Sequence, residues 1–65
     1  MIEKIGTNAG AIWAVLSENN GQAVKAIKKA TKLKDKEVYA ALGWLGREGK
    51  ISLEETEEDV IVTLL

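Results

Sequence analysis

The chain has 65 residues, and its nine Lys or Arg against ten Asp or Glu give a formal net charge of −1. This length predicts one small domain over residues 1–65. Cysteine and histidine are both absent, which excludes disulfides, zinc sites built from Cys and His, and any catalytic triad that needs an imidazole. The balanced charge gives no overall attraction to nucleic acid or to acidic membranes.

The sequence also lacks the signs of a membrane or secreted protein. No apolar run approaches the roughly 20 residues that a membrane-spanning helix needs. The N-terminal sequence MIEKIGTNAG has no long apolar core of the signal-peptide kind. We therefore expect a soluble, cytoplasmic protein with no membrane partner.

Residues 8–18 are predicted to form the first helix. Thr7 or Asn8 can cap its first turn with a side-chain oxygen, and Asn19–Gly21 ends it. Before the helix, Gly6 is expected to let the chain turn so that Ile2 and Ile5 fold back on the core. The helix shows an apolar stripe with the spacing i, i+3, i+4, i+7, formed by Ala9, Ile12, Trp13 and Leu16.

Residues 24–31 predict a short second helix with two different faces. One face is apolar and is expected to join the core: Val24, Ile27 and Ala30. The other face, continued into the turn that follows, is basic: Lys25, Lys28, Lys29 and Lys32.

Residues 35–48 predict a third helix, with Asp35 and Glu37 in its first turn, where they suit the helix dipole. At about 100° per residue, the core face collects Val38, Ala41, Leu42 and Leu45. The opposite face collects Lys36, Tyr39, Ala40, Gly43 and Arg47. Trp44 lies between the two faces. Gly43 and Gly46 each cost a helix about 1 kcal/mol relative to Ala, which favours a close approach by another backbone or a ligand.

After Gly49 the hydrophobic period changes to two, which predicts a β-hairpin. Residues 51–54 form its first strand, residues 55–58 the loop, and residues 59–65 (DVIVTLL) the second strand. Both faces of the second strand are largely apolar. A two-stranded hairpin on three helices can cover only one of them, so the other is expected to stay exposed.

These pieces together resemble the winged helix-turn-helix superfamily over nearly the whole chain. The resemblance is carried by residues 27–31, by residues 33–38, and by LGWLGREGKI at residues 42–51, which looks like the leucine-rich run that ends in Glu-Gly before the wing of many such proteins. More narrowly, residues 8–13 and 38–45 are similar to a family of very small, stand-alone winged-helix proteins of unestablished function. The resemblance implies a mainly α fold with three helices and a two-stranded wing.

Two positions depart from the pattern of that superfamily. The turn between the second and third helices often has Gly where this chain has Lys32. The third helix usually starts with Ser or Thr, whereas this chain has Lys34, which has no acceptor for a helix cap but can contact a phosphate as a cation. Members of the superfamily usually bind DNA as dimers, although many are protein-interaction modules.

The lysines around the turn are the first candidate site. Phosphate contacts are expected from Lys25, Lys28, Lys29, Lys34 and Lys36. Lys36, Tyr39 and Arg47 would face the major groove of duplex DNA. The bland interpretation is that these lysines are only the solvated face of a short helix.

The hairpin tip argues against close DNA contact. It places five negative charges together: Glu54, Glu55, Glu57, Glu58 and Asp59. Phosphates would repel these charges, so either the wing is held off the DNA or DNA is not the ligand. Charges at a hairpin tip also resist edge-to-edge aggregation, which is the simpler interpretation. Consecutive acids lack the spacing of a calcium loop, so we expect no metal site.

A second candidate surface would join two copies of the chain. Its expected members are the off-core Trp44 and the outer face of the last strand: Trp44, Ile61, Thr63 and Leu65. The bland interpretation is that Trp44 packs beneath the wing and Leu65 frays.

No feature of the sequence points to catalysis, a cofactor or a small-molecule substrate, because it has no Gly-rich phosphate loop and no activated nucleophile. The sequence therefore predicts a non-enzymatic, DNA-binding, transcription-related homodimer. The alternative is a protein-interaction module that kept the fold without binding DNA.

Overall fold

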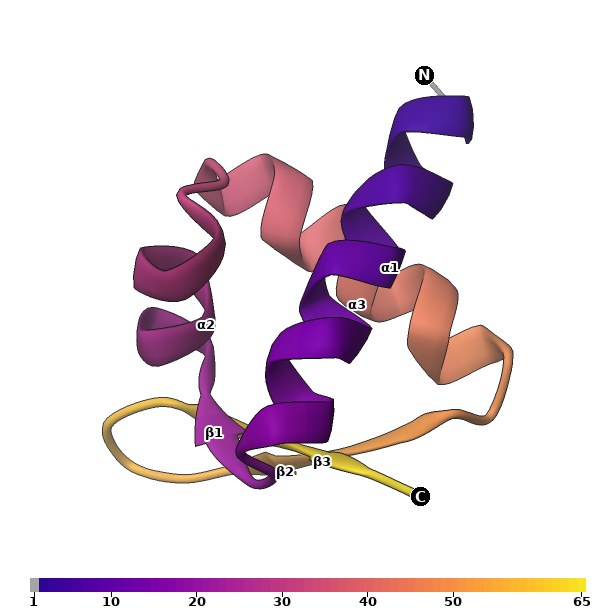
Figure 1. Cartoon of the computed structure of the whole chain (residues 1–65). Helices are drawn as coiled ribbons and strands as arrows, with labels where there is room; N and C mark the ends of the chain where they lie inside the picture. Colours follow the sequence, from indigo (N-terminus) through magenta and orange to yellow (C-terminus); the bar gives the residue numbers. More distant parts are fainter. Residues whose placement is uncertain (1) are drawn as a thin grey trace.

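Three helices cover one side of a small antiparallel sheet (Figure 1). The computed structural model describes residues 2–65. The elements in chain order are α1 (Ile2–Glu18), β1 (Gln22–Ala23), α2 (Val24–Thr31), α3 (Asp35–Arg47), β2 (Ile51–Glu55) and β3 (Val60–Leu64). This architecture confirms the predicted mainly α winged helix-turn-helix fold. No helix within residues 2–65 combines the length and the apolar character that a membrane span requires.

The first helix is longer than the sequence analysis predicted. It begins at Ile2 rather than at residue 8, so Gly6 lies inside the helix instead of in a turn. Thr7 is not a cap, because its Oγ1 donates to the carbonyl oxygen of Glu3 one turn back at 3.1 Å. Asn8 is not a cap either and is buried in the helix. One Gly costs a helix only about 1 kcal/mol, which an otherwise continuous helix can absorb.

The prediction that Ile5 folds back on the core was wrong, and the same prediction for Ile2 is not tested. Ile5 is half-buried on the continuous helix rather than folded back, and the side chain of Ile2 lies outside the described residues. The added turns carry Lys4 along α3, where its Nζ lies 3.1 Å from a carboxylate oxygen of Glu37.

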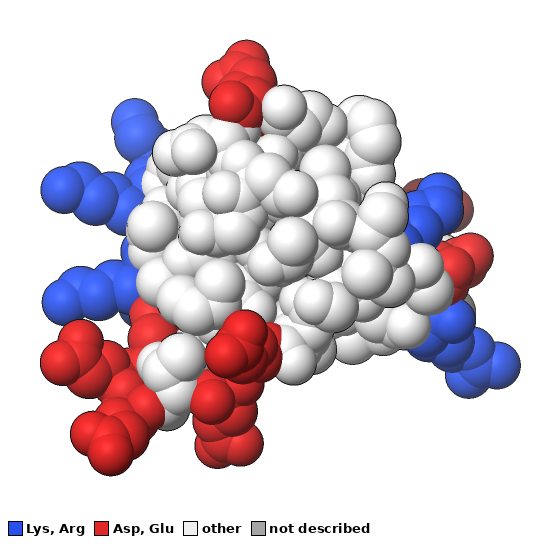
Figure 2. Space-filling model, turned by 90° about the horizontal axis from the view of Figure 1, so that it is seen from below, with Lys and Arg blue, Asp and Glu red and all other residues white. Residues whose placement is uncertain are grey.

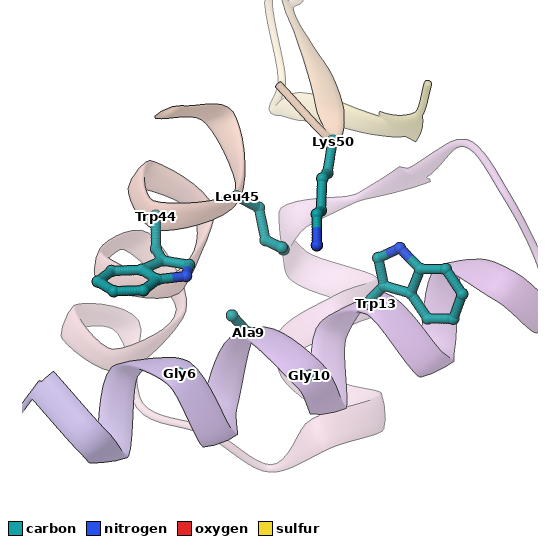
Figure 3. A pocket seen from close by; sticks show the side chains of 7 residues that line it. All are labelled: Gly6, Ala9, Gly10, Trp13, Trp44, Leu45 and Lys50. Atoms are coloured by element: carbon teal, nitrogen blue, oxygen red, sulfur yellow. The ribbon is translucent and has the colours of Figure 1, made fainter. Parts of the chain in front are cut away.

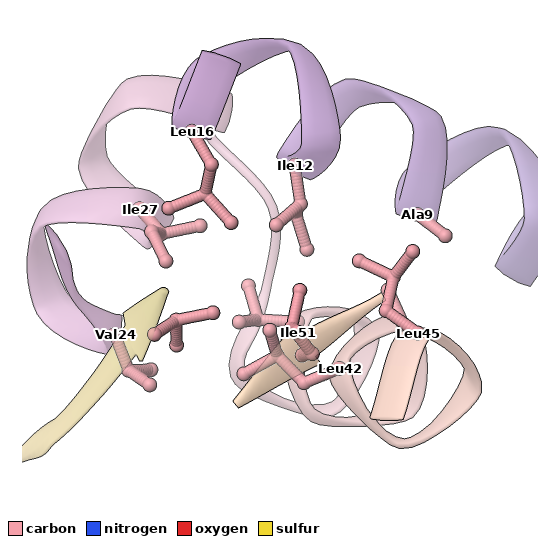
Figure 4. Packing of buried hydrophobic residues seen from close by; sticks show 11 residues of the cluster. Ala9, Ile12, Leu16, Val24, Ile27, Leu42, Leu45 and Ile51 are labelled. Carbon is pink, nitrogen blue, oxygen red and sulfur yellow. The ribbon is translucent and has the colours of Figure 1, made fainter. Parts of the chain in front are cut away.

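The core lies between the helices and the inner face of the sheet (Figure 4). Its largest fully buried side chains come from all three helices and from β3: Ile12, Leu16, Ile27, Val38 and Val62. The predicted core face of α3 is confirmed. Ala30 is exposed, contrary to the prediction, because each step of three residues falls 60° short of a full turn and two such steps carry Ala30 away from Val24.

The sheet has one strand more than the predicted hairpin. Its order is β1-β3-β2, with Gln22 paired to Val62 and Ala23 to Ile61 on one side of β3. On the other side Ile51 pairs with Leu64 and continues to Glu55 with Val60. A strand of two residues carries no detectable period, which is why β1 was missed. It converts β3 from an edge strand into the central strand.

The exit from α3 is a Schellman motif, which explains the Glu-Gly pair before the wing. Gly49 has φ +71°, and its N–H donates to the carbonyl of Gly46 at 3.1 Å. The N–H of Lys50 donates to the carbonyl of Leu45, also at 3.1 Å. These two bonds satisfy carbonyls that the helix end would leave unpaired, and they fix Lys50 next to Leu45.

The turn between α2 and α3 contains a lysine in the conformation that glycine prefers. Lys32 has φ +60° and ψ +23°, and its N–H donates to the carbonyl of Lys28 at 2.8 Å. The left-handed conformation costs a non-glycine residue roughly 1–2 kcal/mol. Lys32 therefore adopts the left-handed conformation at the position where related proteins often have Gly, although lysine is less suited to that conformation.

We predict that Lys32→Gly raises the free energy of unfolding by about 1 kcal/mol, because glycine adopts a positive φ without strain. Lys29→Gly is the matched control. It removes the same side chain from the interior of α2 and should lower stability by about 1 kcal/mol. Urea unfolding followed by circular dichroism measures both. An unchanged or lower stability for Lys32→Gly would contradict the assignment of strain to this turn.

Candidate nucleic-acid interface

The lysines predicted to contact phosphate lie on α2 and at the start of α3. Lys25, Lys29, Lys34 and Lys36 are exposed, whereas Lys28 is half-buried. Lys28 also forms an ion pair with Asp35, with its Nζ 2.5 Å from a carboxylate oxygen. Four of these five cations are therefore open to solvent. The charge of the fifth, Lys28, is partly neutralised by the ion pair that joins α2 to α3.

The outer face of α3 agrees with the predicted helical wheel. Tyr39 is 55% exposed, and Arg47 and Gly43 are exposed as well. Ala40 is half-buried, because it lines a shallow pocket with residues of α1. A Cβ added at Gly43 would meet nothing within 4 Å. Within residues 2–65 nothing therefore requires glycine at this position.

The start of α3 is capped by Glu37 rather than by the residue before the helix. The N–H of Lys34 donates to Oε1 of Glu37 at 3.0 Å. The side chain of Lys34 cannot accept a hydrogen bond from the backbone N–H of Glu37, because an ammonium group has no acceptor. The backbone bond from Lys34, reinforced by the ion pair with Lys4, lowers the pKa of Glu37. The side chain of Lys34 consequently takes no part in the cap, as the sequence analysis expected.

The acidic loop is tied to α2 by one carboxylate. Oδ2 of Asp59 accepts the backbone N–H of Lys25, which lies in the first turn of α2, at 3.0 Å. Oδ1 accepts the N–H of Val60 at 2.7 Å. These two bonds lower the pKa of Asp59, with the Lys25 bond the stronger cause. Asp59 therefore caps α2 from a position 34 residues away in the sequence, which sequence reasoning did not find.

The loop itself is closed by a reciprocal set of hydrogen bonds. Thr56 donates to the carbonyl oxygen of Asp59 through its N–H at 2.8 Å and through its Oγ1 at 2.6 Å. The N–H of Asp59 donates back to Oγ1 of Thr56 at 3.0 Å. The loop thus presents Asp59 to α2 in a fixed orientation and does not extend freely from the sheet.

This docking places opposite charges side by side. Lys25 and Lys29 line the same surface hollow as Glu58 and Asp59. Figure 2 shows the acidic loop next to basic side chains on one flank of the molecule. The remaining acids of the loop stay exposed. Because the positive surface of α2 borders a negative one, the field that reaches a distant phosphate is weaker than the lysines alone would give.

The residues predicted to join two copies belong to two different layers of the molecule. Ile61 and Thr63 alternate with the buried Val62, so they lie on the face of the sheet that the helices leave uncovered, and the 79% exposed Leu65 follows them. Trp44 is 41% exposed and lies in the helical layer, beside α1. The structure therefore does not bring Trp44 together with Ile61 and Thr63, whereas the N–H of Leu65 donates at 3.0 Å to the carbonyl of Lys50, which lines the same pocket as Trp44.

No metal site is evident within residues 2–65, where no three acidic side chains converge in a suitable group.

Comparisons with known proteins agree with the observed architecture. The family model described as "Winged helix-turn-helix domain (DUF2582)" matches residues 1–64. The solution NMR structure of protein BT2368 from Bacteroides thetaiotaomicron is similar, with a TM-score of 0.85 and 27% sequence identity over 95% of this chain and 76% of that chain. No curated protein matches.

The pKa shift of Asp59 predicts how stability depends on pH. Its pKa in the folded state lies below the ordinary value of 3.8, so the ionised carboxylate stabilises the fold above that value, and the contribution is lost as the pH falls through the folded pKa. We expect the free energy of unfolding of the wild-type protein to fall as the pH is lowered from about 5 to about 2. The free energy of unfolding of the Asp59→Asn variant should fall less steeply over the same range.

Glu57→Gln is the matched control, because it removes one negative charge from the same loop without touching α2. Urea unfolding at a series of pH values should give this variant the wild-type slope. If Asp59→Asn also kept that slope, the cap would not be contributing through its charge.

Proposed function

Because this chain belongs to the winged helix-turn-helix domain family DUF2582, we propose that it is a non-enzymatic, transcription-related protein that binds duplex DNA as a homodimer. The observation that supports this best is the set of exposed lysines on α2 and at the start of α3: Lys25, Lys29, Lys34 and Lys36. In a helix-turn-helix this is the region that meets the DNA backbone.

The phosphate contacts in this proposal come from side chains and not from the start of α2. Asp59 already accepts the N–H of Lys25, so an entering phosphate would have to displace a carboxylate there. Within residues 2–65 the side chains of Lys29, Lys34 and Lys36 form no ion pair. Each phosphate that they neutralise releases a counterion, which gives an affinity that falls steeply with salt.

The outer face of α3 offers little sequence discrimination. Lys36 and Arg47 have long side chains that can donate to guanine, and Tyr39 can add one contact. Gly43 reads no base, but its open surface lets the helix lie closer to the groove. We propose that binding is mainly to the backbone and that the docked acidic loop stays outside the groove.

The dimer in this proposal uses the uncovered face of the sheet. Figure 2 shows that this face is broad and uncharged at its centre. Ala23 and Ile61 lie opposite each other on this face and give it an apolar centre, which Ser52 and Glu54 of β2 border. Ile61 and Thr63 would meet their own copies across a two-fold axis, which is the commonest symmetry of small homo-oligomers. The basic residues of α2 belong to the helical layer and would stay accessible.

A protein-interaction module is the second candidate, and one observation favours it. The exposed acids of the loop border the lysines of α2 and weaken the field that attracts DNA. In that case oligomerisation would persist while DNA binding would be absent at low salt.

We predict that the protein binds a random duplex with a log-log salt slope of about −3 to −4 per chain, from three or four phosphate contacts. The double variant Lys29→Glu/Lys34→Glu should weaken binding at least about tenfold at low salt. Lys50→Glu, which makes a single charge reversal away from this surface, is the control. Fluorescence anisotropy of a labelled duplex measures all three, and the absence of binding at about 50 mM salt would reject the DNA proposal.

We predict that Ile61→Lys weakens the dimer at least about tenfold, because it buries a charge in the proposed interface. The lysine would lie opposite Glu54 on β2, an arrangement that preserves the fold of the single chain. Sedimentation velocity measures the oligomeric state and circular dichroism the fold. Wild-type protein that sediments as a monomer, or an Ile61→Lys variant that still forms dimers, would rule out this interface.

A further inference from the structure

The helices form an open pocket on the surface, between the middle of α1 and the end of α3 (Figure 3). Its volume is about 240 Å³, and it is lined by Gly6, Ala9, Gly10, Trp13, Trp44, Leu45 and Lys50. Both tryptophans of the chain line it. Trp13 is 47% exposed and Trp44 41% exposed, although large aromatic side chains dominate the burial of most small cores.

Every polar side-chain atom that lines this pocket is a hydrogen-bond donor. The indole nitrogens of Trp13 and Trp44 donate only, and the ammonium group of Lys50 has three donors and no acceptor. Figure 3 shows the Lys50 ammonium between the two indole rings. No carboxylate is among the lining residues. Among residues 2–65, these three groups make no side-chain hydrogen bond or ion pair within the chain.

The pocket is built by features that the DNA proposal does not use. The Schellman motif after α3 sets Lys50 at the rim, five residues after Leu45. Gly6 and Gly10, one turn apart on α1, leave the floor open, because a Cβ added at either would meet nothing within 4 Å. The walls are therefore aromatic, the floor is bare, and the rim carries one positive charge.

From this geometry we propose that the pocket binds a small organic anion with an apolar body, such as an aromatic carboxylate. The indole faces would contact the apolar body. Lys50 and an indole N–H would donate to the carboxylate, in the charge-assisted manner that gives the strongest hydrogen bonds. A neutral ligand would leave the ammonium group unpaired beside the aromatic walls.

The size of the pocket limits the ligand. Drug-sized ligands occupy sites of about 300–1,000 Å³, so this open pocket of about 240 Å³ suits a smaller molecule with part of its surface in water. We therefore expect a dissociation constant in the range of about 0.1–1 mM for a simple probe.

Intrinsic tryptophan fluorescence provides the test, since both tryptophans report on this pocket. We propose titrating the protein with 3-phenylpropionate and with its neutral amide, 3-phenylpropionamide. The dissociation constant obtained from the fluorescence titration should be at least about tenfold lower for the carboxylate than for the amide. Lys50→Gln should remove this preference for the carboxylate without weakening the binding of the amide. Lys25→Gln, which makes the same change on α2, should leave it intact.

Amide chemical shifts in ¹⁵N-labelled protein locate the binding. The largest changes should fall on residues 6–13 and 44–50. Three results would each overturn the proposal: no response to the carboxylate up to about 10 mM, shifts centred outside these segments, or an undiminished carboxylate preference in Lys50→Gln. An emission maximum that shifts with protein concentration alone would also overturn the proposal, because a second copy of the chain would then cover the pocket.

Discussion

The arrangement of this molecule depends on β3 as the central strand of the sheet. Its residue Val62 is fully buried under the helices, while β1 and β2 hydrogen-bond to its two edges. β1 leads directly into α2, and β2 follows α3, so one strand fixes the positions of both helices of the helix-turn-helix. The amide of Asn20 adds to this, because its Oδ1 accepts the N–H of Leu64 at 2.8 Å.

The cap that Asp59 places on α2 links the wing to the proposed function. It gives the start of α2 the negative partner that a helix N-terminus favours. It also holds the acidic loop beside the basic helix, where the two charges partly cancel. The chain therefore stabilises its short second helix with the same carboxylate that, in our proposal, would weaken its attraction for DNA. This constraint explains why the fold predicts DNA binding more strongly than the charge distribution does.

The surface of the molecule divides into regions of different chemistry. The lysines of α2 and α3 form a basic flank, the outer face of the sheet is largely uncharged, and the tryptophans line a pocket between α1 and α3. The three regions use different side chains, so the proposed DNA binding, self-association and ligand binding would not compete for the same ones. A ligand between α1 and α3 would contact the helix whose outer face meets the DNA in our proposal.

The sequence by itself determined the features that repeat along an element: α2, α3, the hairpin and the core face with Val38 and Leu42, because amphipathic periods survive in one dimension. Only the tertiary structure decided the contacts between distant segments. These are β1 against β3, Asp59 against α2, and Trp13 beside Trp44 and Lys50. A two-residue strand has no period, and a capping carboxylate 34 residues away has no local signal. A pocket exists only once α1, α3 and the residue before β2 have met.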